Sequence, residues 1–328
     1  MANEITLLSK NEVRSILMMR DTMEALRVAF VDHYRKKTQM VRRNYLFPSK
    51  GRIGCMGALV ESLQSAGYKI VSTFHENPTL CNLPSITALL VLNDVETGVP
   101  CAIMDATHIT MMRTGAVSAL ATEYLGRKGS KLVGIVGAGE QGRGQLMGLT
   151  EVLKLSKAYV YDIDSARTKK FAEQMEKETG LDILSLDSIE EVVRKVDVLA
   201  TATPSKTPVV FNKWVNPGLH INTVGGASRG EQEIDTEIFK RSKLVVDDFE
   251  NASALGGITA PVSTGALSKE DVYAELGEIV AGEKPGRVRD DEVTVFVSSG
   301  LAIQDIATAH IVAKKAIELG LGVKVSLI

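Results

Sequence analysis

A glycine-rich turn constrains the fold of this 328-residue chain more than any other feature of its sequence. An apolar run at residues 132–136 leads into GAGEQG at residues 137–142, and a helix-like pattern follows. Gly137 permits a tight turn, Gly139 permits close approach of a pyrophosphate, and Gly142 permits close packing of the helix on the strand. Phosphate groups would then meet free N–H groups at the start of the helix. The motif therefore predicts dinucleotide contacts through Gly137, Ala138, Gly139, Glu140, Gln141 and Gly142.

An acidic residue stands at the position expected for a ribose-binding carboxylate. A second β-like run, residues 158–161, ends at Asp162, twenty residues after Gly142. A carboxylate there hydrogen-bonds the ribose of NAD(H), whereas a nearby arginine accommodates the extra phosphate of NADP(H). Asp162 therefore favours NAD(H), and Arg167 leaves NADP(H) possible. The alternative interpretation is that Asp162 only caps a helix that begins near Ser165, or lies in a solvated turn.

Composition argues against several other classes of protein. With a net charge of −2 and 24% charged residues, the chain has no basic stripe for nucleic acid. No apolar stretch approaches the roughly 18 residues that span a bilayer, and residues 1–10 lack the apolar region of a signal peptide. The three cysteines fit reduced thiols, and the five histidines show no metal-binding spacing, so we expect no metal site. These features predict a cytoplasmic enzyme.

Strands and helices alternate after the glycine-rich turn, which indicates a parallel, doubly wound sheet. A capping box, Ser268 with Asp271, predicts the start of a further helix before the last strand. An amphipathic pattern over residues 301–318 predicts a final helix. The expected strands lie near Ile183 and at residues 197–203, 220–225, 243–247 and 293–297, and the other expected helices lie at residues 165–178 and 188–195.

The first 105 residues predict a β-rich domain with a helix in front. The helical pattern covers residues 21–34. Apolar runs at residues 87–93 and 100–105, joined by a glycine-containing turn, predict a β-hairpin. Between the helix and the hairpin, residues 39–85 look basic and irregular. A long helical pattern over residues 106–125 then leads towards the glycine-rich turn.

These patterns together predict an α/β fold of two domains. A Rossmann domain with a doubly wound parallel sheet, residues 116–303, is inserted in a second, α+β domain. That second domain consists of residues 1–115 plus residues 304–328, because the C-terminal helix and tail return to it.

Three cations in the first part of the chain are candidates for a substrate site, since a nucleotide fold says nothing about the substrate. Arg113 lies in an otherwise apolar, small-residue helix, where burying a guanidinium is costly without an anion. Its planar fork suits a carboxylate, although an internal salt bridge to Asp105 or Glu123 is the alternative. Lys69 lies in a strand-like run and could point outward, and Arg43 alone would be solvated surface. Together the three cations predict a pocket for a small carboxylate.

Six segments make the sequence similar, over essentially its whole length, to the ornithine cyclodeaminase/mu-crystallin family. They are MDATHITMMRTGAVSALAT (104–122), VGIVGAGEQG (133–142), ATATPSKTPV (200–209), GLHINTVGGASRGEQEID (218–235), AELGEIVAGEKPG (274–286) and SSGLAIQD (298–305). Members of this family include ornithine cyclodeaminases, an archaeal type of alanine dehydrogenase, ketimine reductases and siderophore-precursor synthases. Mu-crystallins also bind NADPH and thyroid hormone. The resemblance implies a Rossmann domain plus a substrate domain that dimerises through its β-strands, and hence a homodimer.

The resemblance also implies roles for particular residues. Arg43, Lys69 and Arg113 resemble the residues with which the family holds the substrate carboxylate, and Lys69 and Arg113 are the expected catalytic residues. Asp162 and the glycine-rich turn look like cofactor contacts. The carboxyl ends of the strands, where nicotinamide and substrate should meet, are represented by Thr201, Thr203, Val224, Gly225, Ser299 and Gly300.

Two positions depart from the pattern of the cyclodeaminases. Cyclodeaminases and the alanine dehydrogenase type carry an aspartate in INxVGxD, whereas INTVGGAS places Ala227 there. The mu-crystallin and ketimine-reductase branch likewise lacks this aspartate. Cyclodeaminases also carry a glutamate where Gly54 stands. Ala227 is therefore expected at the substrate without supplying a carboxylate, and the next acids, Glu231 and Glu233, do not occupy its position.

The missing aspartate favours one of the family's reactions over the others. Removing hydride from an amino acid needs a base for the amine and an activated water for the iminium, and a carboxylate suits both. A preformed cyclic imine is already basic enough to be protonated, so positioning and electrostatics supply most of the acceleration. The sequence therefore predicts NAD(P)H-dependent reduction of Δ1-pyrroline-2-carboxylate to L-proline, or of Δ1-piperideine-2-carboxylate to L-pipecolate. Lys69 and His75 are candidate proton donors.

Three other functions stay open at this point. The first is amino-acid oxidoreduction of the alanine dehydrogenase type. The second is conversion of ornithine to proline and ammonia. The third is NADPH binding without turnover, as in a mu-crystallin-like protein. Each would still involve a small imino or amino acid or a bound cofactor rather than nucleic acid or membrane.

Overall fold

The chain divides into two units, each with its own β-sheet. Unit 1 consists of Met1–Arg113 together with Leu301–Ile328, and unit 2 consists of Thr114–Gly300. The computed structural model describes residues 4–41, 43–74, 76–225 and 231–326. No helix in these ranges is long and apolar enough to cross a membrane.

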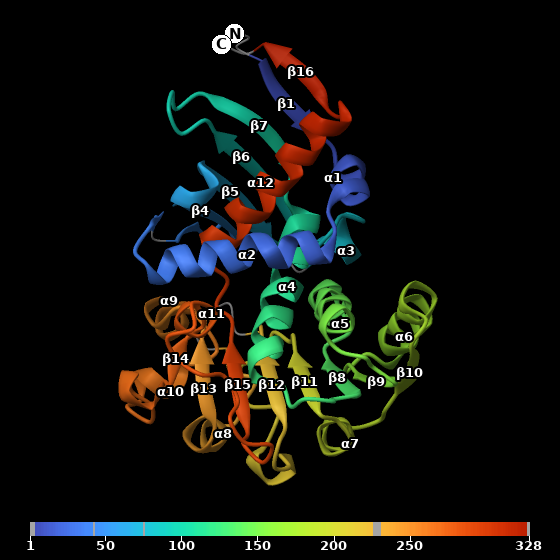
Figure 1. Ribbon diagram of the computed structural model, residues 1–328. Helices are drawn as coiled ribbons and strands as arrows, with labels where there is room; N and C mark the ends of the chain where they lie inside the picture. The colour runs from blue at the N-terminus through green and yellow to red at the C-terminus, as the bar shows by residue number, and fades with distance from the viewer. Residues whose placement is uncertain (1–3, 42, 75, 226–230, 327–328) are drawn as a thin grey trace. The chain divides into compact units, whose positions relative to one another are not determined.

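Unit 2 contains a parallel sheet with strand order β10-β9-β8-β11-β12-β15-β13-β14 (Figure 1). Every neighbouring pair in this order runs parallel. The strands are β8 (Leu132–Val136), β9 (Lys157–Tyr161), β10 (Asp182–Ser185), β11 (Val198–Thr201), β12 (His220–Thr223), β13 (Lys243–Val246), β14 (Ala274–Glu275) and β15 (Thr294–Val297). The predicted doubly wound parallel sheet is therefore confirmed.

The helices of unit 2 alternate with these strands, so each connection returns the chain to the same edge of the sheet. They are α5 (Glu140–Val152), α6 (Ser165–Thr179), α7 (Ile189–Lys195), α8 (Thr236–Arg241), α9 (Phe249–Leu255), α10 (Thr259–Ser263), α11 (Leu276–Val280) and the 3₁₀ helices η2 (Asn212–Trp214) and η3 (Lys269–Asp271). The predicted capping box of Ser268 and Asp271 is present, but it begins the three-residue η3 rather than a long helix.

Apolar side chains cover both faces of this sheet, as a buried parallel sheet requires. On one face, α5 and α6 pack with Ile135 of β8 in a core that includes Leu146. On the other face, α7 and α8 pack with Leu199 of β11 in a core that includes Phe239. Because successive side chains of a strand point to opposite faces, the nearly continuous apolar strands supply both cores.

Helix α4 (Thr107–Leu125) continues across the boundary between the units, and its part in unit 2 packs very closely on α5. A Cβ atom on Gly115 would lie 2.0 Å from the carbonyl oxygen of Gly144, and one on Gly148 would lie 2.4 Å from that of Gly115. The two helices therefore meet backbone to backbone, which side chains at these positions would prevent.

Unit 1 contains a mixed sheet with strand order β16-β1-β7-β6-β5-β4-β2, and β3 also pairs with β4. The β1–β7 pair is parallel, and the other pairs are antiparallel. The strands are β1 (Glu4–Leu8), β2 (Thr38–Met40), β3 (Asn44–Leu46), β4 (Arg52–Val60), β5 (Ser65–Thr73), β6 (Ile86–Asn93), β7 (Pro100–Asp105) and β16 (Val323–Ser326). The helices are α1 (Lys10–Ile16), α2 (Met19–Tyr34), α3 (Asn77–Leu80), α12 (Ala302–Leu319) and the 3₁₀ helix η1 (Glu61–Leu63).

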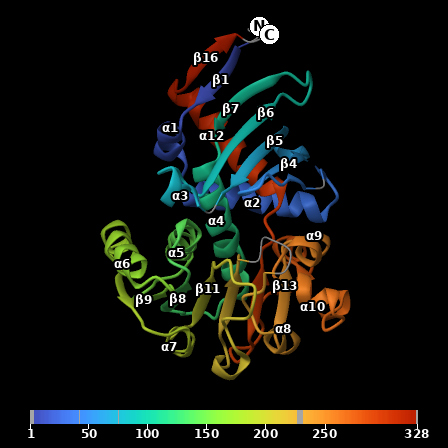
Figure 2. The ribbon, with the colours of Figure 1, turned by 180° about the vertical axis from the view of Figure 1, so that it is seen from behind.

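The two faces of this mixed sheet differ. Helix α12 crosses one face, against β4, β5 and β6, and α2 packs on α12 (Figure 1). Figure 2 shows the opposite face, where β5 and β6 lie in front of α12. That face exposes about half of the surface of three apolar side chains, Tyr68 (48%), Ile70 (51%) and Leu89 (57%). We call these three residues the apolar sheet face.

The prediction that residues 39–85 are irregular was wrong. This segment forms β2, β3 and the long hairpin strands β4 and β5. The sequence pattern of this segment is hard to interpret, because β5 exposes the apolar Tyr68 and Ile70 and buries the charged Lys69. In an ordinary strand with one solvated face, the apolar side chains are buried and the charged ones are exposed. The predicted hairpin of β6 and β7 is confirmed. The short helix α1, which Ser9 and Glu12 cap reciprocally, was not predicted.

Candidate functional site

The glycine-rich turn of unit 2 has the geometry that its sequence predicts. Gly137 has a φ of +106°, and a Cβ atom there would lie 2.6 Å from the carbonyl oxygen of Ala202. A Cβ atom on Gly142 would lie 2.0 Å from the carbonyl oxygen of Gly137. Gly139 differs, because nothing lies within 4 Å of its Cβ position. The first and third glycines are thus required by the fold, whereas the open second position leaves room for a ligand.

This contrast yields a prediction for two alanine substitutions. Gly142→Ala should lower the midpoint of thermal unfolding by several degrees, because its Cβ atom would overlap backbone. Gly139→Ala should leave that midpoint unchanged, since its φ is −93° and its Cβ position is open. It should nevertheless weaken NADH binding about tenfold by holding the pyrophosphate away from the backbone. Calorimetry and NADH fluorescence measure the two quantities, and equal effects of both substitutions would contradict the assignment.

Asp162 holds the glycine-rich turn against the end of β9. Its Oδ2 accepts a hydrogen bond from the backbone N–H of Ala138 at 2.8 Å, and its Oδ1 accepts one from Asp164 at 3.0 Å. Asp164, not Asp162, caps helix α6, because its Oδ1 accepts from the N–H of Arg167 at 3.1 Å. Nη1 of Arg167 lies 3.6 Å from Oδ1 of Asp162. The acid and the arginine that bear on the choice between NAD(H) and NADP(H) are therefore paired with each other.

A small cavity of about 170 Å³ lies beside this turn. It is lined by Gly139 and Glu140 of the turn and by three cationic side chains, Arg143, Arg167 and Lys170. Positive charge next to a dinucleotide turn suits phosphate oxygens.

Glu233 is a buried carboxylate that joins the carboxyl ends of β11 and β12. Its Oε2 accepts hydrogen bonds from the hydroxyls of Thr201 (2.7 Å) and Thr223 (2.9 Å) and from the N–H of Gly225 (2.9 Å). Its Oε1 accepts from the N–H of Thr203 at 2.6 Å. Burial raises the pKa of Glu233, and these hydrogen bonds act to lower it. Three predicted cofactor residues, Thr201, Thr203 and Gly225, are thus held by one side chain.

Asp247 is a second buried carboxylate, and it joins the carboxyl ends of β13 and β15. Its Oδ2 accepts from the N–H groups of Ser299 (2.7 Å) and Gly300 (2.9 Å) and from the hydroxyl of Ser298 (3.2 Å). Its Oδ1 accepts from the hydroxyl of Ser299 at 2.8 Å and from the N–H of Asp248 at 3.0 Å. Burial raises the pKa of Asp247 to about 6. The two predicted residues Ser299 and Gly300 are therefore also fixed by a buried carboxylate.

Lys69, Arg113 and Asp305 form a buried ion-pair cluster in unit 1. Nζ of Lys69 lies 2.7 Å from Oδ1 of Asp305, and Nε of Arg113 lies 3.1 Å from the same oxygen. Nη1 of Arg113 donates to Oε1 of Gln304 at 2.8 Å, and Nζ of Lys69 donates to Oγ1 of Thr110 at 3.4 Å. The side chains of Lys69 and Asp305 are each 1% exposed. Lys69 therefore points inward, and the internal partner of Arg113 is Asp305 rather than Asp105 or Glu123.

The cluster has unusual acid–base properties. Burial lowers the pKa of Lys69 to about 7, with Asp305 acting against the decrease and the charges of Arg113 and Arg43 adding to it. Burial alone would raise the pKa of Asp305, but Lys69 and Arg113 outweigh it and hold that pKa below its usual value. Asp305 is therefore ionised near neutral pH, where Lys69 can gain or lose a proton.

The remaining predicted substrate residues fall into two groups. Arg43 is half-buried, its Nη1 donates to the hydroxyl of Tyr45 at 3.3 Å, and its charge acts on both Lys69 and Asp305. The charges of the three predicted cations therefore interact with one another in the structure. Ala227 and His75 lie outside the described residues.

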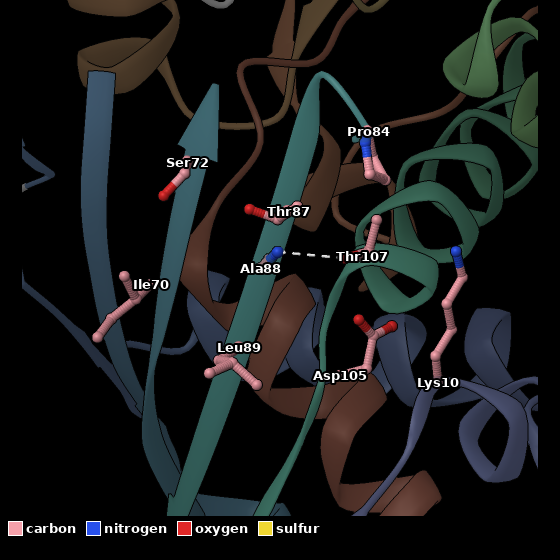
Figure 3. Close-up of a pocket in the computed structure, with 9 residues that line it drawn as sticks. All are labelled: Lys10, Ile70, Ser72, Pro84, Thr87, Ala88, Leu89, Asp105 and Thr107. Atoms are coloured by element: carbon pink, nitrogen blue, oxygen red, sulfur yellow. Dashed lines mark hydrogen bonds between the residues drawn. The ribbon is translucent and has the colours of Figure 1, made fainter. Parts of the chain in front are cut away.

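A separate, open cavity of about 400 Å³ lies on the sheet of unit 1 (Figure 3). Figure 3 shows Ile70 and Ser72 on β5 and Thr87 and Leu89 on β6, with the N–H of Ala88 donating to Oγ1 of Thr107 at 3.1 Å. The described residues that line it include neither Lys69 nor Arg113. The cavity adjoins the apolar sheet face and is distinct from the cationic cluster.

The sequence did not identify the three buried acids Asp305, Glu233 and Asp247 as parts of the site. Asp305 closes the recognised segment SSGLAIQD, Glu233 was noted only as an acid after Ala227, and Asp247 was placed only at the end of a strand. The available signal was an acidic residue inside an apolar stretch, which is expensive unless it is paired or hydrogen-bonded.

Comparison with known proteins places this geometry in a family. A model described as the ornithine cyclodeaminase/mu-crystallin family matches residues 3–319. The chain belongs to this family. An alanine dehydrogenase of Archaeoglobus fulgidus is 42% identical over 322 residues, which cover 98% of each chain. The resemblance inferred from the six sequence segments is therefore confirmed.

Two solved structures are similar over nearly their full length. An archaeal alanine dehydrogenase dimer with bound NAD has a TM-score of 0.94 and 41% identity, covering 99% of this chain and all of that one. The Δ1-pyrroline-2-carboxylate reductase of Thermococcus litoralis, in complex with NADH and L-proline, also has a TM-score of 0.94 and 41% identity. That match covers 98% of this chain and 100% of the other. The predicted fold class of this family member is confirmed.

Proposed function

We propose that this family member reduces a cyclic ketimine carboxylate with NAD(P)H, forming L-proline or L-pipecolate. The chain is an NAD(P)-dependent oxidoreductase that acts on carbon–nitrogen bonds. Its cofactor is NAD(H) or NADP(H), and the carboxylate of Asp162 after β9, beside the glycine-rich turn, favours NAD(H).

The observation that carries this proposal is the charge of the buried cluster. Lys69 and Arg113 share the single carboxylate of Asp305, so the three side chains together carry one excess positive charge when Lys69 is protonated. Arg43 adds a second positive charge nearby. Excess positive charge in a buried site favours an anionic ligand. A small substrate carboxylate satisfies this need, and the planar guanidinium of Arg113 suits it.

The proposed reaction places few further demands on the protein. Hydride from C4 of the reduced nicotinamide forms a C–H bond at the imine carbon, the C=N π electrons pass to nitrogen, and NADH becomes NAD⁺. The nitrogen ends with one more proton, which Lys69 can supply because its pKa is about 7. No carboxylate is required at the position of Ala227, because no water attacks the imine in this direction.

A second candidate is amino-acid oxidoreduction of the alanine dehydrogenase type, since a relative with 42% identity bears that name. It also uses a small carboxylate, but it needs ammonia or water at the imine carbon. Ala227→Asp distinguishes the two, because a carboxylate there should raise oxidation of amino acids relative to reduction of cyclic imines. An unchanged ratio of the two rates would show that this position does not select the reaction.

The apolar sheet face supports a further proposal, that the protein is a homodimer. Tyr68, Ile70 and Leu89 expose apolar surface on neighbouring strands, which is typical of an interaction surface. The similar alanine dehydrogenase is a dimer. Light scattering should give twice the mass of one chain, and Ile70→Glu should reduce that mass to a single chain.

The decisive experiment follows the absorbance of the reduced nicotinamide with purified protein. Δ1-Pyrroline-2-carboxylate and Δ1-piperideine-2-carboxylate should each be tested with NADH and with NADPH. Pyruvate plus ammonia, and ornithine plus NAD⁺, serve as parallel assays. We expect rapid oxidation of the cofactor with a cyclic imine alone. Turnover only with pyruvate and ammonia would overturn the proposal in favour of the alanine dehydrogenase type.

A further inference from the structure

Two of the buried acids described above were given no role in the proposed reaction. Glu233 binds the ends of β11 and β12, and Asp247 binds the ends of β13 and β15. Because β12 and β15 are neighbours in the sheet, the two acids bind adjacent parts of one edge. Side chains that only cap strand ends are usually neutral or solvated. These two are carboxylates, and Glu233 is 1% exposed and Asp247 is 0% exposed.

Their hydrogen bonds favour the ionised form of both acids. Each oxygen of Asp247 accepts from a backbone N–H, those of Ser299 and Gly300 on Oδ2 and that of Asp248 on Oδ1. Both oxygens of Glu233 likewise accept from backbone N–H groups. A backbone N–H can donate but cannot accept, so these fixed donors stabilise the ionised form and oppose the effect of burial, which raises the pKa of both acids.

The described residues place no cationic side chain in an ion pair with either acid. In the part of the chain that the structure describes, every group that hydrogen-bonds to them is neutral. Negative charge in a buried region produces a field that water screens poorly. The groups that the acids hold, including Thr201, Gly225 and Ser299, form the edge of the sheet above them.

In a doubly wound sheet, ligands bind at the carboxyl ends of the strands, next to the point where the strand order reverses. Here the order reverses between β8 and β11, so the nicotinamide end of the cofactor is expected over β11, β12 and β15. The oxidised nicotinamide ring carries a positive charge and the reduced ring carries none. We propose that Glu233 and Asp247 set the preference of this protein for oxidised over reduced cofactor, because they place negative charge at the edge of the sheet where the nicotinamide would bind.

This inference rests on the proposed function only for the position of the nicotinamide. It adds a role for charge in the reaction itself. When hydride passes from NADH to a protonated imine, one positive charge leaves the substrate and appears on the nicotinamide ring. Fixed negative charge near the nicotinamide would stabilise the transition state in which that positive charge develops. The two carboxylates are therefore positioning residues that also favour imine reduction.

The test measures the dissociation constants of NAD⁺ and NADH, by calorimetry and by NADH fluorescence, for the full-length protein and for Glu233→Gln and Asp247→Asn. Each substitution removes one negative charge and keeps the shape of the side chain. We expect each to raise the ratio of the NAD⁺ constant to the NADH constant about tenfold, mostly through weaker NAD⁺ binding. Unmodified protein should bind NAD⁺ at least as tightly as NADH.

Thr223→Val provides the matched control, because it removes one hydrogen bond to Glu233 while leaving its charge in place. Its ratio should equal that of the unmodified protein. If the amide variants weaken the binding of NAD⁺ and of NADH by the same factor, the carboxylates only hold the strand ends and the inference is wrong. If an amide variant does not fold, the ratio for the unmodified protein decides, and clearly tighter NADH binding overturns the inference. Absence of any cofactor binding by unmodified protein would instead contradict the proposed function.

Discussion

Replacing Lys69 with methionine is expected to lower kcat/KM for the cyclic imine about a thousandfold, because a charged hydrogen bond to the substrate carboxylate and a proton donor are lost together. Lys69 is 1% exposed and lies 2.7 Å from Asp305. Methionine keeps most of the apolar stem, and Arg113 still pairs with Asp305, so the fold should survive. Initial rates at saturating NADH measure the effect.

Binding of NADH separates this result from a general loss of structure. The predicted cofactor residues belong to unit 2, and Lys69 belongs to unit 1, so the dissociation constant of NADH should not change in the variant. Lys157→Met is a suitable control, because the side chain of Lys157 is 32% exposed and pairs with Asp182, whose side chain is 52% exposed. Unaltered imine reduction by the Lys69 variant would rule out the carboxylate site proposed for the cationic cluster.

Replacing Asp305 with asparagine should lower kcat/KM about a hundredfold and shift its pH dependence. In the unmodified protein, Lys69 loses its proton as the pH rises through about 7. The positive charge that attracts the substrate is then lost, so kcat/KM should fall above this pH. Asp305 raises the pKa of Lys69, and its removal should therefore move the decline to lower pH.

The shape of this pH profile distinguishes charge from packing. A purely structural defect would lower kcat/KM by the same factor at every pH. Asp305→Glu, which restores the charge, should return the decline towards pH 7. Asp105→Asn, in the open cavity on the same unit, should leave the profile unchanged. A profile for Asp305→Asn that is parallel to that of the unmodified protein would contradict the role assigned to Asp305.

Local sequence patterns were sufficient to predict the parallel sheet of unit 2. The glycine-rich turn, the acid at residue 162 and the alternating strands are signals that act within about thirty residues, and each corresponds to an element of the parallel sheet. A parallel sheet buried on both faces also produces continuous apolar runs, which can be read without knowing what packs on them. The family resemblance added the candidate substrate residues, but not their partners.

The partners were missed because they depend on contacts between distant segments. Asp305 resembles an ordinary acid in the first turn of a helix, where the helix dipole favours it. Only the fold places it against Lys69 and Arg113. The orientation of Lys69 was equally hidden, because β5 exposes Tyr68 and Ile70 and so reverses the usual pattern of an amphipathic strand. Both omissions have one physical cause, namely that the burial of a side chain is decided by the distant segments that pack around it.

The position of Asp305 in the chain also matters while the protein is being synthesised. Arg113 leaves the ribosome 192 residues before the carboxylate that pairs with it, a delay of about 10 to 40 s at usual rates of translation. During this time the cations that become buried in unit 1 have no counter-charge from Asp305, and helix α12 does not yet cover β4 and β5. The nascent sheet of unit 1 therefore has to wait for the last 28 residues, Leu301–Ile328, before it can bury its charges. A premature stop codon before Leu301 would leave unit 2 encoded in full, whereas unit 1 would lack Asp305 and the helix that covers β4 and β5.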